Sequence, residues 1–144
     1  MRLLFAAFLL ATATLPAQKR PVTHEDVFTM KRTGSPVPSP DGKWVVFSVT
    51  EPDYDPAKTV SDLWIVPVDG SAPARRLTSS KGSESGVVWS PDSSKIVFTA
   101  KREGDDVAQL YLLPVTGGEA QRLTTLPTAP STPQWRPDGQ GLLF

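Results

Sequence analysis

Short runs of apolar residues, separated by turn-forming residues, follow one another along most of the chain. Residues 45–47 and 96–98 are apolar at three successive positions, and each run closely follows a Ser-Pro-Asp segment. A strand covered on one face only would alternate apolar and polar positions, so Val45, Val46 and Phe47 predict a strand that is buried on both faces. The pattern predicts an all-β chain of short strands.

The runs belong to an internal repeat, which has to be identified before a fold is assigned. Residues 39–47, 90–98 and 136–144 align without gaps, and their Pro-Asp pairs lie 51 and then 46 positions apart. Several motifs that recur in one order are very improbable by chance. The other matching segments are 62–68 with 109–115 and 76–78 with 122–124.

Each period predicts four strands, named a, b, c and d in chain order. Strand a ends at Trp89 or Trp135, and strand d ends at Thr78 or Thr124. Four-stranded antiparallel sheets with a period near 45 residues, packed face to face, are the blades of a β-propeller. An open β-sandwich would explain the strands but neither the repeated turn nor the period. Strands b are expected at 43–49 and 95–99 and strands c at 63–66 and 110–113, in blades covering 37–84, 85–130 and 131–144.

The third repeat stops after its strand b, which predicts an incomplete propeller of about two and a half blades. Propellers close with roughly four to eight blades. A partial ring exposes a sheet face and open strand edges, which favours aggregation. We therefore expect the natural product to continue well past Phe144.

Each repeated Ser-Pro-Asp-Gly segment, or its variant, predicts a tight turn between strands a and b. Proline presets φ, aspartate bonds back to the backbone, and glycine closes the corner. Ser93-Ser94 in the second repeat and Arg136 in the third depart from the pattern but are compatible with the turn. Because these aspartates lie in separate blades, we expect structural turns rather than a metal site. The turn residues are Pro40, Asp41, Gly42, Pro91, Asp92, Pro137, Asp138 and Gly139.

The strand directions divide the loops between two faces of the disk. Successive strands reverse direction, so the a–b and c–d turns lie on one face and the b–c and d–a loops on the other. The first repeat is longer between strands b and c, where residues 51–56 form an insertion and a candidate functional loop.

Before the first blade, residues 18–36 are expected to be a linker with a short helix at 21–32, which Thr23 can cap.

The N-terminus is typical of a secretory signal. Arg2 precedes an apolar run at 3–13, and small residues follow up to Ala17, so we expect a signal peptide at 1–17. A buried apolar helix of a cytosolic protein is the alternative. Export predicts a periplasmic or secreted protein, and no later apolar stretch is long enough to span a membrane after signal cleavage.

Charge and composition exclude several partners. The 15 basic and 15 acidic side chains balance, which favours neither nucleic acid nor anionic lipid. The absence of cysteine excludes disulfides, thiolate metal sites and a lipidated N-terminal cysteine.

No catalytic set is expected in this chain. A hydrolytic triad needs a nucleophile, a base and an orienting acid, and His24 is the only histidine. The Gly-Ser-Glu-Ser-Gly segment at 82–86 fails as a nucleophile elbow, because Glu84 takes the central place that serine must occupy. We interpret it as a polar loop leading into a strand. We expect no catalytic residue, no cofactor and no metal.

The repeats carry a family resemblance. Residues 89–92 (Trp-Ser-Pro-Asp), with 135–138 and 118–124, resemble the repeats of TolB-type propellers. Glu25-Asp26-Val27, Gly34-Ser35-Pro36 and Ser61-Asp62-Leu63-Trp64 resemble the opening of the prolyl oligopeptidase family of serine peptidases. Its bacterial acylaminoacyl-peptidase and dipeptidyl-peptidase branch is the most similar, over residues 22–144.

The resemblance implies a fold for the missing part and a role for this one. In that family the propeller precedes an α/β-hydrolase domain and admits short peptides to its Ser-Asp-His triad. The implied partners are a C-terminal hydrolase domain of the same protein and short peptide substrates. The alternatives are a non-catalytic periplasmic propeller that binds proteins, as TolB does, and a propeller fused to another hydrolase. The repeats themselves name a fold rather than a function.

Overall fold

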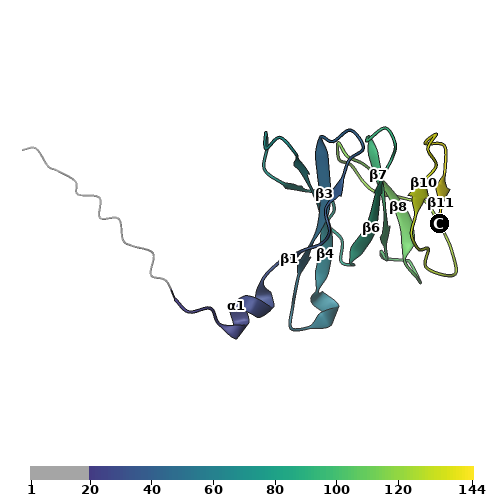
Figure 1. Ribbon diagram of the computed structural model, residues 1–144. Helices are drawn as coiled ribbons and strands as arrows, with labels where there is room; N and C mark the ends of the chain where they lie inside the picture. The colour runs from purple at the N-terminus through teal and green to yellow at the C-terminus, as the bar shows by residue number, and fades with distance from the viewer. Residues whose placement is uncertain (1–19) are drawn as a thin grey trace, which may run out of the picture.

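The computed structural model describes residues 20–144, so the signal peptide expected at 1–17 lies outside the described residues. Within residues 20–144, the helix α1 (His24–Thr29) precedes three sheets that stand side by side in chain order (Figure 1). All the strand pairs in these sheets are antiparallel. The predicted class, an all-β incomplete propeller of four-stranded blades, is confirmed.

The first blade is built on a long hairpin of two eight-residue strands. Their register pairs Trp44 with Pro67 at one end and Glu51 with Val60 at the other. The sheet order is β1-β3-β4-β5, and β2 pairs with β3 on the same side as β1. The strands are β1 (Arg32–Thr33), β2 (Val37–Pro38), β3 (Trp44–Glu51), β4 (Val60–Pro67) and β5 (Arg75–Arg76).

Strand a of the first blade is therefore interrupted. Between its halves, Gly34 donates its N–H to the Ser48 carbonyl at 2.9 Å, and a Cβ atom on Gly34 would lie 2.2 Å from the Ser48 hydroxyl. A side chain at position 34 would therefore force the Ser48 hydroxyl to move. The helix is also shorter than the predicted 21–32, because Arg32 is already paired in β1 and α1 ends at Thr29.

The second blade is a four-stranded sheet in the order β6-β7-β8-β9. Its strand a shifts register between Ser85 and Val88, at the place in the repeat where β1 gives way to β2, and Gly86 there has φ of +64°. The bulge is thus a feature of both blades. The strands of this blade and of the hairpin that begins the third are β6 (Glu84–Trp89), β7 (Lys95–Ala100), β8 (Gln109–Pro114), β9 (Gln121–Arg122), β10 (Gln134–Trp135) and β11 (Leu142–Leu143).

The hydrophobic core fills the space between the first two blades. Ile96, Val97 and Phe98 are all fully buried, as expected for a strand covered on both faces. The matching prediction for residues 45–47 holds only for Val46, since Val45 and Phe47 are half-buried. Among residues 20–144, the first blade is packed against a neighbouring sheet on one face only. The core cluster comprises Val46, Leu63, Ile65, Trp89, Ile96, Phe98, Ala100, Tyr111 and Leu113.

The three a–b turns have the same backbone geometry. In each, the fourth residue donates its N–H to the first residue's carbonyl at 2.9 Å, and it has a positive φ: +70° at Gly42, +60° at Ser93 and +68° at Gly139. Asp92 accepts hydrogen bonds from the Ser90 hydroxyl at 2.6 Å and from the Ser94 N–H at 3.1 Å. These bonds lower the pKa of Asp92 to about 2.

Candidate functional site

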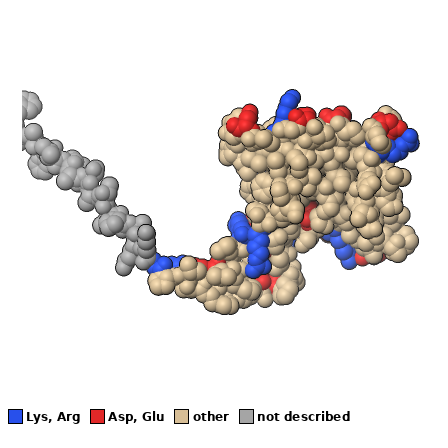
Figure 2. All heavy atoms as spheres, viewed as in Figure 1, with Lys and Arg blue, Asp and Glu red and all other residues tan. Residues whose placement is uncertain are grey.

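The chain has two faces with different contents. The turn face holds the segments 39–42, 67–71, 90–93 and 114–118, and the loop face holds α1 and the segments 52–59, 77–83 and 101–108. Figure 1 shows α1 and the first of these loops together at one end of the blades. Figure 2 shows basic and acidic side chains at both ends of the body, and few charges along the flank between them.

The insertion, residues 52–59, is an ordered loop that projects from the first blade. It contains the 3₁₀ turn η1 (Pro56–Lys58), which Asp55 caps at its N-terminus. Asp55 accepts from the Ala57 N–H at 3.1 Å, and Asp53 accepts from the Asp55 N–H at 2.8 Å. These local bonds hold the loop in shape although most of its side chains are exposed.

Helix α1 is docked on this insertion by aromatic side chains. The ring of Phe28 stacks on the ring of Tyr54 with centroids 4.2 Å apart and planes 7° apart. The Tyr54 hydroxyl donates a 2.5 Å hydrogen bond to Glu25, and this bond raises the pKa of Tyr54. His24 lies on the other side of Phe28, with ring centroids 6.2 Å apart. Residues outside the repeat thus build a second layer on the loop face.

The helix itself is closed locally at its N-terminus. Thr23 and Asp26 form a reciprocal capping box, and Arg20 pairs with Asp26 at 2.5 Å. The hydrogen bond from Arg20 is the main cause of a strongly lowered pKa of Asp26. None of the residues of α1 is buried.

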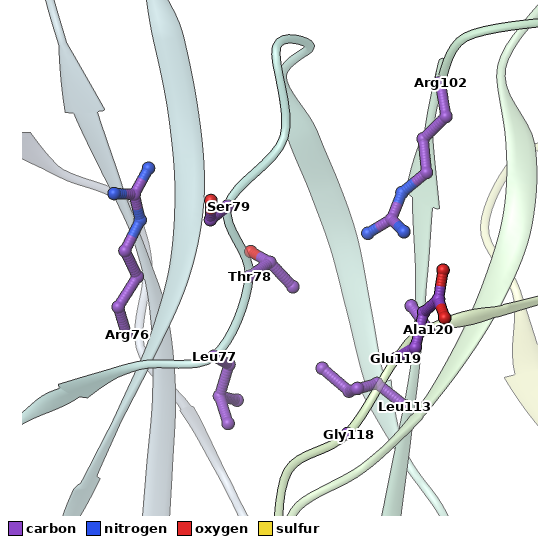
Figure 3. A pocket seen from close by; sticks show the side chains of 9 residues that line it. All are labelled: Arg76, Leu77, Thr78, Ser79, Arg102, Leu113, Gly118, Glu119 and Ala120. Atoms are coloured by element: carbon purple, nitrogen blue, oxygen red, sulfur yellow. The ribbon is translucent and has the colours of Figure 1, made fainter.

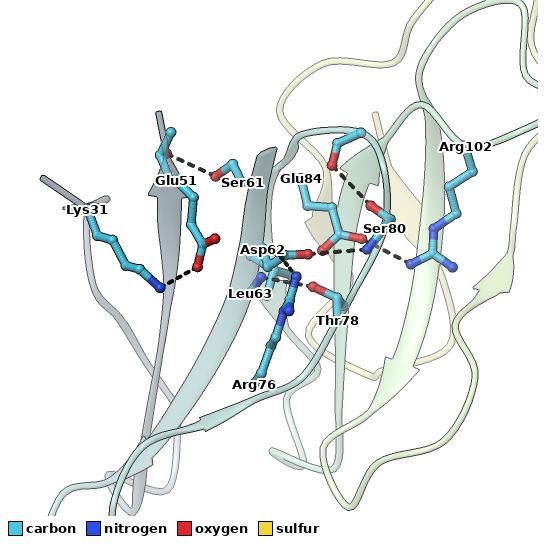
Figure 4. Close-up of polar contacts among 12 residues, drawn as sticks. Lys31, Glu51, Ser61, Asp62, Leu63, Arg76, Thr78, Ser80, Glu84 and Arg102 are labelled. Carbon is cyan, nitrogen blue, oxygen red and sulfur yellow. Dashed lines mark hydrogen bonds and ion pairs between the residues drawn. The ribbon is translucent and has the colours of Figure 1, made fainter. Parts of the chain in front are cut away.

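Buried carboxylates lie just inside the loop face (Figure 4). Asp62, whose side chain is 2% exposed, pairs with Arg76 and accepts the Ser80 N–H at 3.2 Å. Glu84, whose side chain is fully buried, pairs with Arg102 at 3.0 Å. Glu84 starts β6, so the interpretation of residues 82–86 as a polar loop is wrong at this position. The pairing with Arg102 provides the partner that a buried carboxylate requires.

A second buried carboxylate in the same blade organises its b–c loop. Asp105 accepts the Tyr111 hydroxyl at 2.6 Å and the Arg102 N–H at 3.0 Å, and it pairs with Arg122 at 3.1 Å. Burial acts to raise the pKa of Asp105, but these hydrogen bonds and the two arginine charges outweigh it, so the pKa lies below its usual value. The Arg102 guanidinium also lies 4.6 Å from the Tyr111 ring centroid.

A cavity of about 400 Å³ opens between the outer strands of the first two blades (Figure 3). Arg76 and Arg102 line it, but both are already paired with Asp62 and Glu84. Its cations therefore carry no uncompensated charge for an anionic ligand. The remaining lining residues are Leu77, Thr78, Ser79, Leu113, Gly118, Glu119 and Ala120.

The structure does not bring the residues that were singled out in the sequence into one site. The a–b turns lie in three different sheets, so their aspartates do not converge. His24 is exposed on α1. Among residues 20–144, no group of three His, Cys, Asp or Glu side chains is placed to hold a metal ion. The docked pair of α1 and the insertion, by contrast, was missed, because nothing in the repeat connects Phe28 with Tyr54.

Three comparisons with known proteins agree with this architecture. The model of the TolB beta propeller domain matches residues 14–144. The chain is 32% identical over 127 residues to the uncharacterized peptidase YuxL of Bacillus subtilis, covering 87% of this chain and 19% of that protein. It is 30% identical over 126 residues to dipeptidyl-peptidase 5 of Aspergillus fumigatus, covering 73% of this chain and 17% of that protein.

Among solved structures, putative TolB from Agrobacterium tumefaciens is similar, with a TM-score of 0.56 and 28% identity over 73% of this chain and 35% of that chain. The chain spans less than a fifth of the length of the two peptidases. In residues 20–144, no helix has the length and apolar character needed to cross a membrane. The family model covers nearly the whole chain and the blades have the expected form, so the chain belongs to the TolB beta propeller domain family.

Proposed function

We propose that this chain is the N-terminal propeller of an exported serine peptidase. In this proposal the propeller admits short peptides to an α/β-hydrolase domain that follows in the same protein. The observation that carries the proposal is the second layer on the loop face, where α1 stacks on the insertion through Phe28 and Tyr54. Blades alone need no such layer. The similarity to two named peptidases, both much longer than this chain, supports the same reading of the segment as a part of such an enzyme.

The division of labour follows from the side chains that are present. In the described residues the buried ionisable groups of the loop face are neutralised pairs, such as Glu84 with Arg102, rather than a nucleophile with its base. The chemistry would belong to the hydrolase domain, and this chain would restrict the size of the peptides that reach it. Export would follow from the signal peptide expected at 1–17.

The gating role is tested in the intact gene product by shortening the insertion. Residues 52–59 are replaced by a tight two-residue turn, and kcat/KM is measured for a fluorogenic dipeptide and for an unstructured peptide several times longer. We expect kcat/KM for the long peptide to rise about tenfold, equivalent to about 1.4 kcal/mol in barrier height, with the dipeptide value nearly unchanged. Unchanged selection between the two substrates would refute the gate. The 144-residue chain alone should hydrolyse neither substrate.

A second candidate is a non-catalytic periplasmic propeller for protein interaction, or a propeller fused to a different hydrolase. The 28% identity to putative TolB favours it. A fluorophosphonate probe distinguishes the candidates, because it labels an activated serine nucleophile. Labelling of the intact gene product together with hydrolysis of the fluorogenic dipeptide supports the serine peptidase, and absence of labelling from folded protein supports the second candidate.

A further inference from the structure

The segment 20–31 is attached to the rest of the molecule by few contacts. Helix α1 has six residues and buries none of them. Isolated helices shorter than about 12 residues are marginal in water even with good caps. The capping box and the Arg20–Asp26 pair are internal to the segment, so they cannot fix it to the propeller.

The contacts that do reach the propeller converge on one residue. Tyr54 supplies both the ring that stacks on Phe28 and the hydroxyl that bonds to Glu25. Where the segment joins β1, Lys31 pairs with Glu51 at 2.5 Å, but the two side chains are 63% and 43% exposed. Such a pair contributes little, and most of the docking free energy must come from Tyr54.

The insertion depends on the same contact from the other side. Its internal bonds involve Asp53, Asp55 and Thr59, while Tyr54 is 57% exposed even with Phe28 against it. Without α1 the ring would stand almost free in solvent. Tyr54 is thus the main attachment of α1, and Phe28 is the side chain that covers the Tyr54 ring in an insertion whose backbone has its own hydrogen bonds.

We propose that residues 20–31 form a strap that docks on the insertion at 52–59, and that the two segments order and release together through the Phe28–Tyr54 contact. The device is an order–disorder equilibrium of the kind used in switching loops. The consequence for access rests on the proposed function: release of the strap would widen the passage for peptides at the loop face, and docking would narrow that passage. Coupling of this kind is reciprocal: loss of the Phe28–Tyr54 contact from either side must loosen the other segment by a similar factor.

Hydrogen exchange on the millisecond scale, read by mass spectrometry on the intact chain, tests the coupling. We expect Tyr54→Ala to accelerate exchange in residues 24–31 about tenfold, and Phe28→Ala to accelerate exchange in residues 52–59 by a similar factor. Tyr54→Phe keeps the stack and loses the hydrogen bond, so its effect should be smaller. Val27→Ala is the matched control, because Val27 is 55% exposed on the same helix, and it should leave the insertion unchanged.

Protection of β3 and β4 in every variant shows that the blade remains folded. Exchange that changes only in the mutated segment, with its partner unaffected, overturns the strap. The size-selection assay gives an independent result for the gate. If Tyr54→Ala accelerates exchange in both segments but leaves size selection as in the wild type, the strap stands and the proposed gating function fails.

Discussion

The N–H of Asp41 donates a 3.1 Å hydrogen bond to the hydroxyl of Ser93, joining the a–b turns of neighbouring blades. Ser93 occupies the position that glycine holds in the other two turns, and it does so with a φ of +60°. A non-glycine residue in this region is strained by roughly 1 kcal/mol. The hydroxyl compensates for that strain by tying the second blade to the first.

Two substitutions at this position separate the strain from the bond. Ser93→Ala keeps the strained backbone and loses the bond, so we expect the free energy of unfolding to fall by about 1 kcal/mol. Ser93→Gly loses the bond but relieves the strain, so it should be nearly neutral. Urea denaturation of the two variants checks this order. Equal stability of Ser93→Ala and the wild type would show that the bond contributes nothing.

A second contact between the blades offers a comparison within the repeat. The indole N–H of Trp89 donates to the Val37 carbonyl at 3.0 Å, whereas the indole nitrogen of Trp135, at the equivalent place, is buried with no partner among the described residues. Trp89→Phe should destabilise the chain by about 1–2 kcal/mol more than Trp135→Phe. Thermal unfolding of both variants measures the difference, and equal losses would contradict the role of the Trp89 bond.

The blade register could be predicted from the sequence because its signals are local. Proline, aspartate and glycine each shape the turn through their own backbone and side chain. The spacing of Pro40, Pro91 and Pro137 therefore predicts the length of the repeat and the position of each turn. Burial in the first blade was overestimated for Val45 and Phe47, because the same apolar run occurs in a strand covered on both faces and in one covered on a single face. That difference depends on the neighbouring blade and not on the strand.

The loop face was harder to predict, since its pairs are distant in sequence. Glu84 lies among glycines and serines, which is typical of a surface loop, and its partner Arg102 comes 18 positions later. Phe28 and Tyr54 lie on two segments outside the repeat, so no alignment of blades connects them. Glu84 lies five positions before the buried Trp89 in β6, and an odd separation puts two residues on opposite faces of a regular strand. The burial of Glu84 could therefore have been inferred only with the bulge at Gly86 known.

Breaking the Glu84–Arg102 pair should lower the free energy of unfolding strongly, whereas replacing both partners should lower it much less. Arg102→Met leaves a buried carboxylate without its cation, so we expect a loss of roughly 3 kcal/mol in the free energy of unfolding. Adding Glu84→Gln removes the unpaired charge and should restore at least half of that loss. Denaturant unfolding of the single and double variants measures both steps.

An exposed pair on the same face is the control for this experiment. Lys31→Met breaks the Lys31–Glu51 pair, in which the side chains are 63% and 43% exposed, and should cost less than about 0.5 kcal/mol. If Arg102→Met lowers the free energy of unfolding no more than Lys31→Met does, burial does not make the Glu84–Arg102 pair more important for stability than an exposed pair.

The lowered pKa of Asp105 predicts a loss of stability in acid. The folded state stabilises the charged form of Asp105 more than the unfolded chain does. In the unfolded chain the pKa of an aspartate is about 3.9. The resulting stabilisation is present above that value and is lost as the pH falls through the lower pKa of the folded state.

Tyr111→Phe removes the hydroxyl that donates to Asp105 at 2.6 Å, so it should raise the pKa of Asp105 and weaken the dependence of stability on pH below about 4. NMR measures the pKa directly in the wild type and the variant. The side-chain carboxyl ¹³C shift of Asp105 is followed as the pH is lowered from about 6 to about 2. A titration midpoint that is the same in both proteins would show that the Tyr111 hydroxyl does not stabilise the charged form.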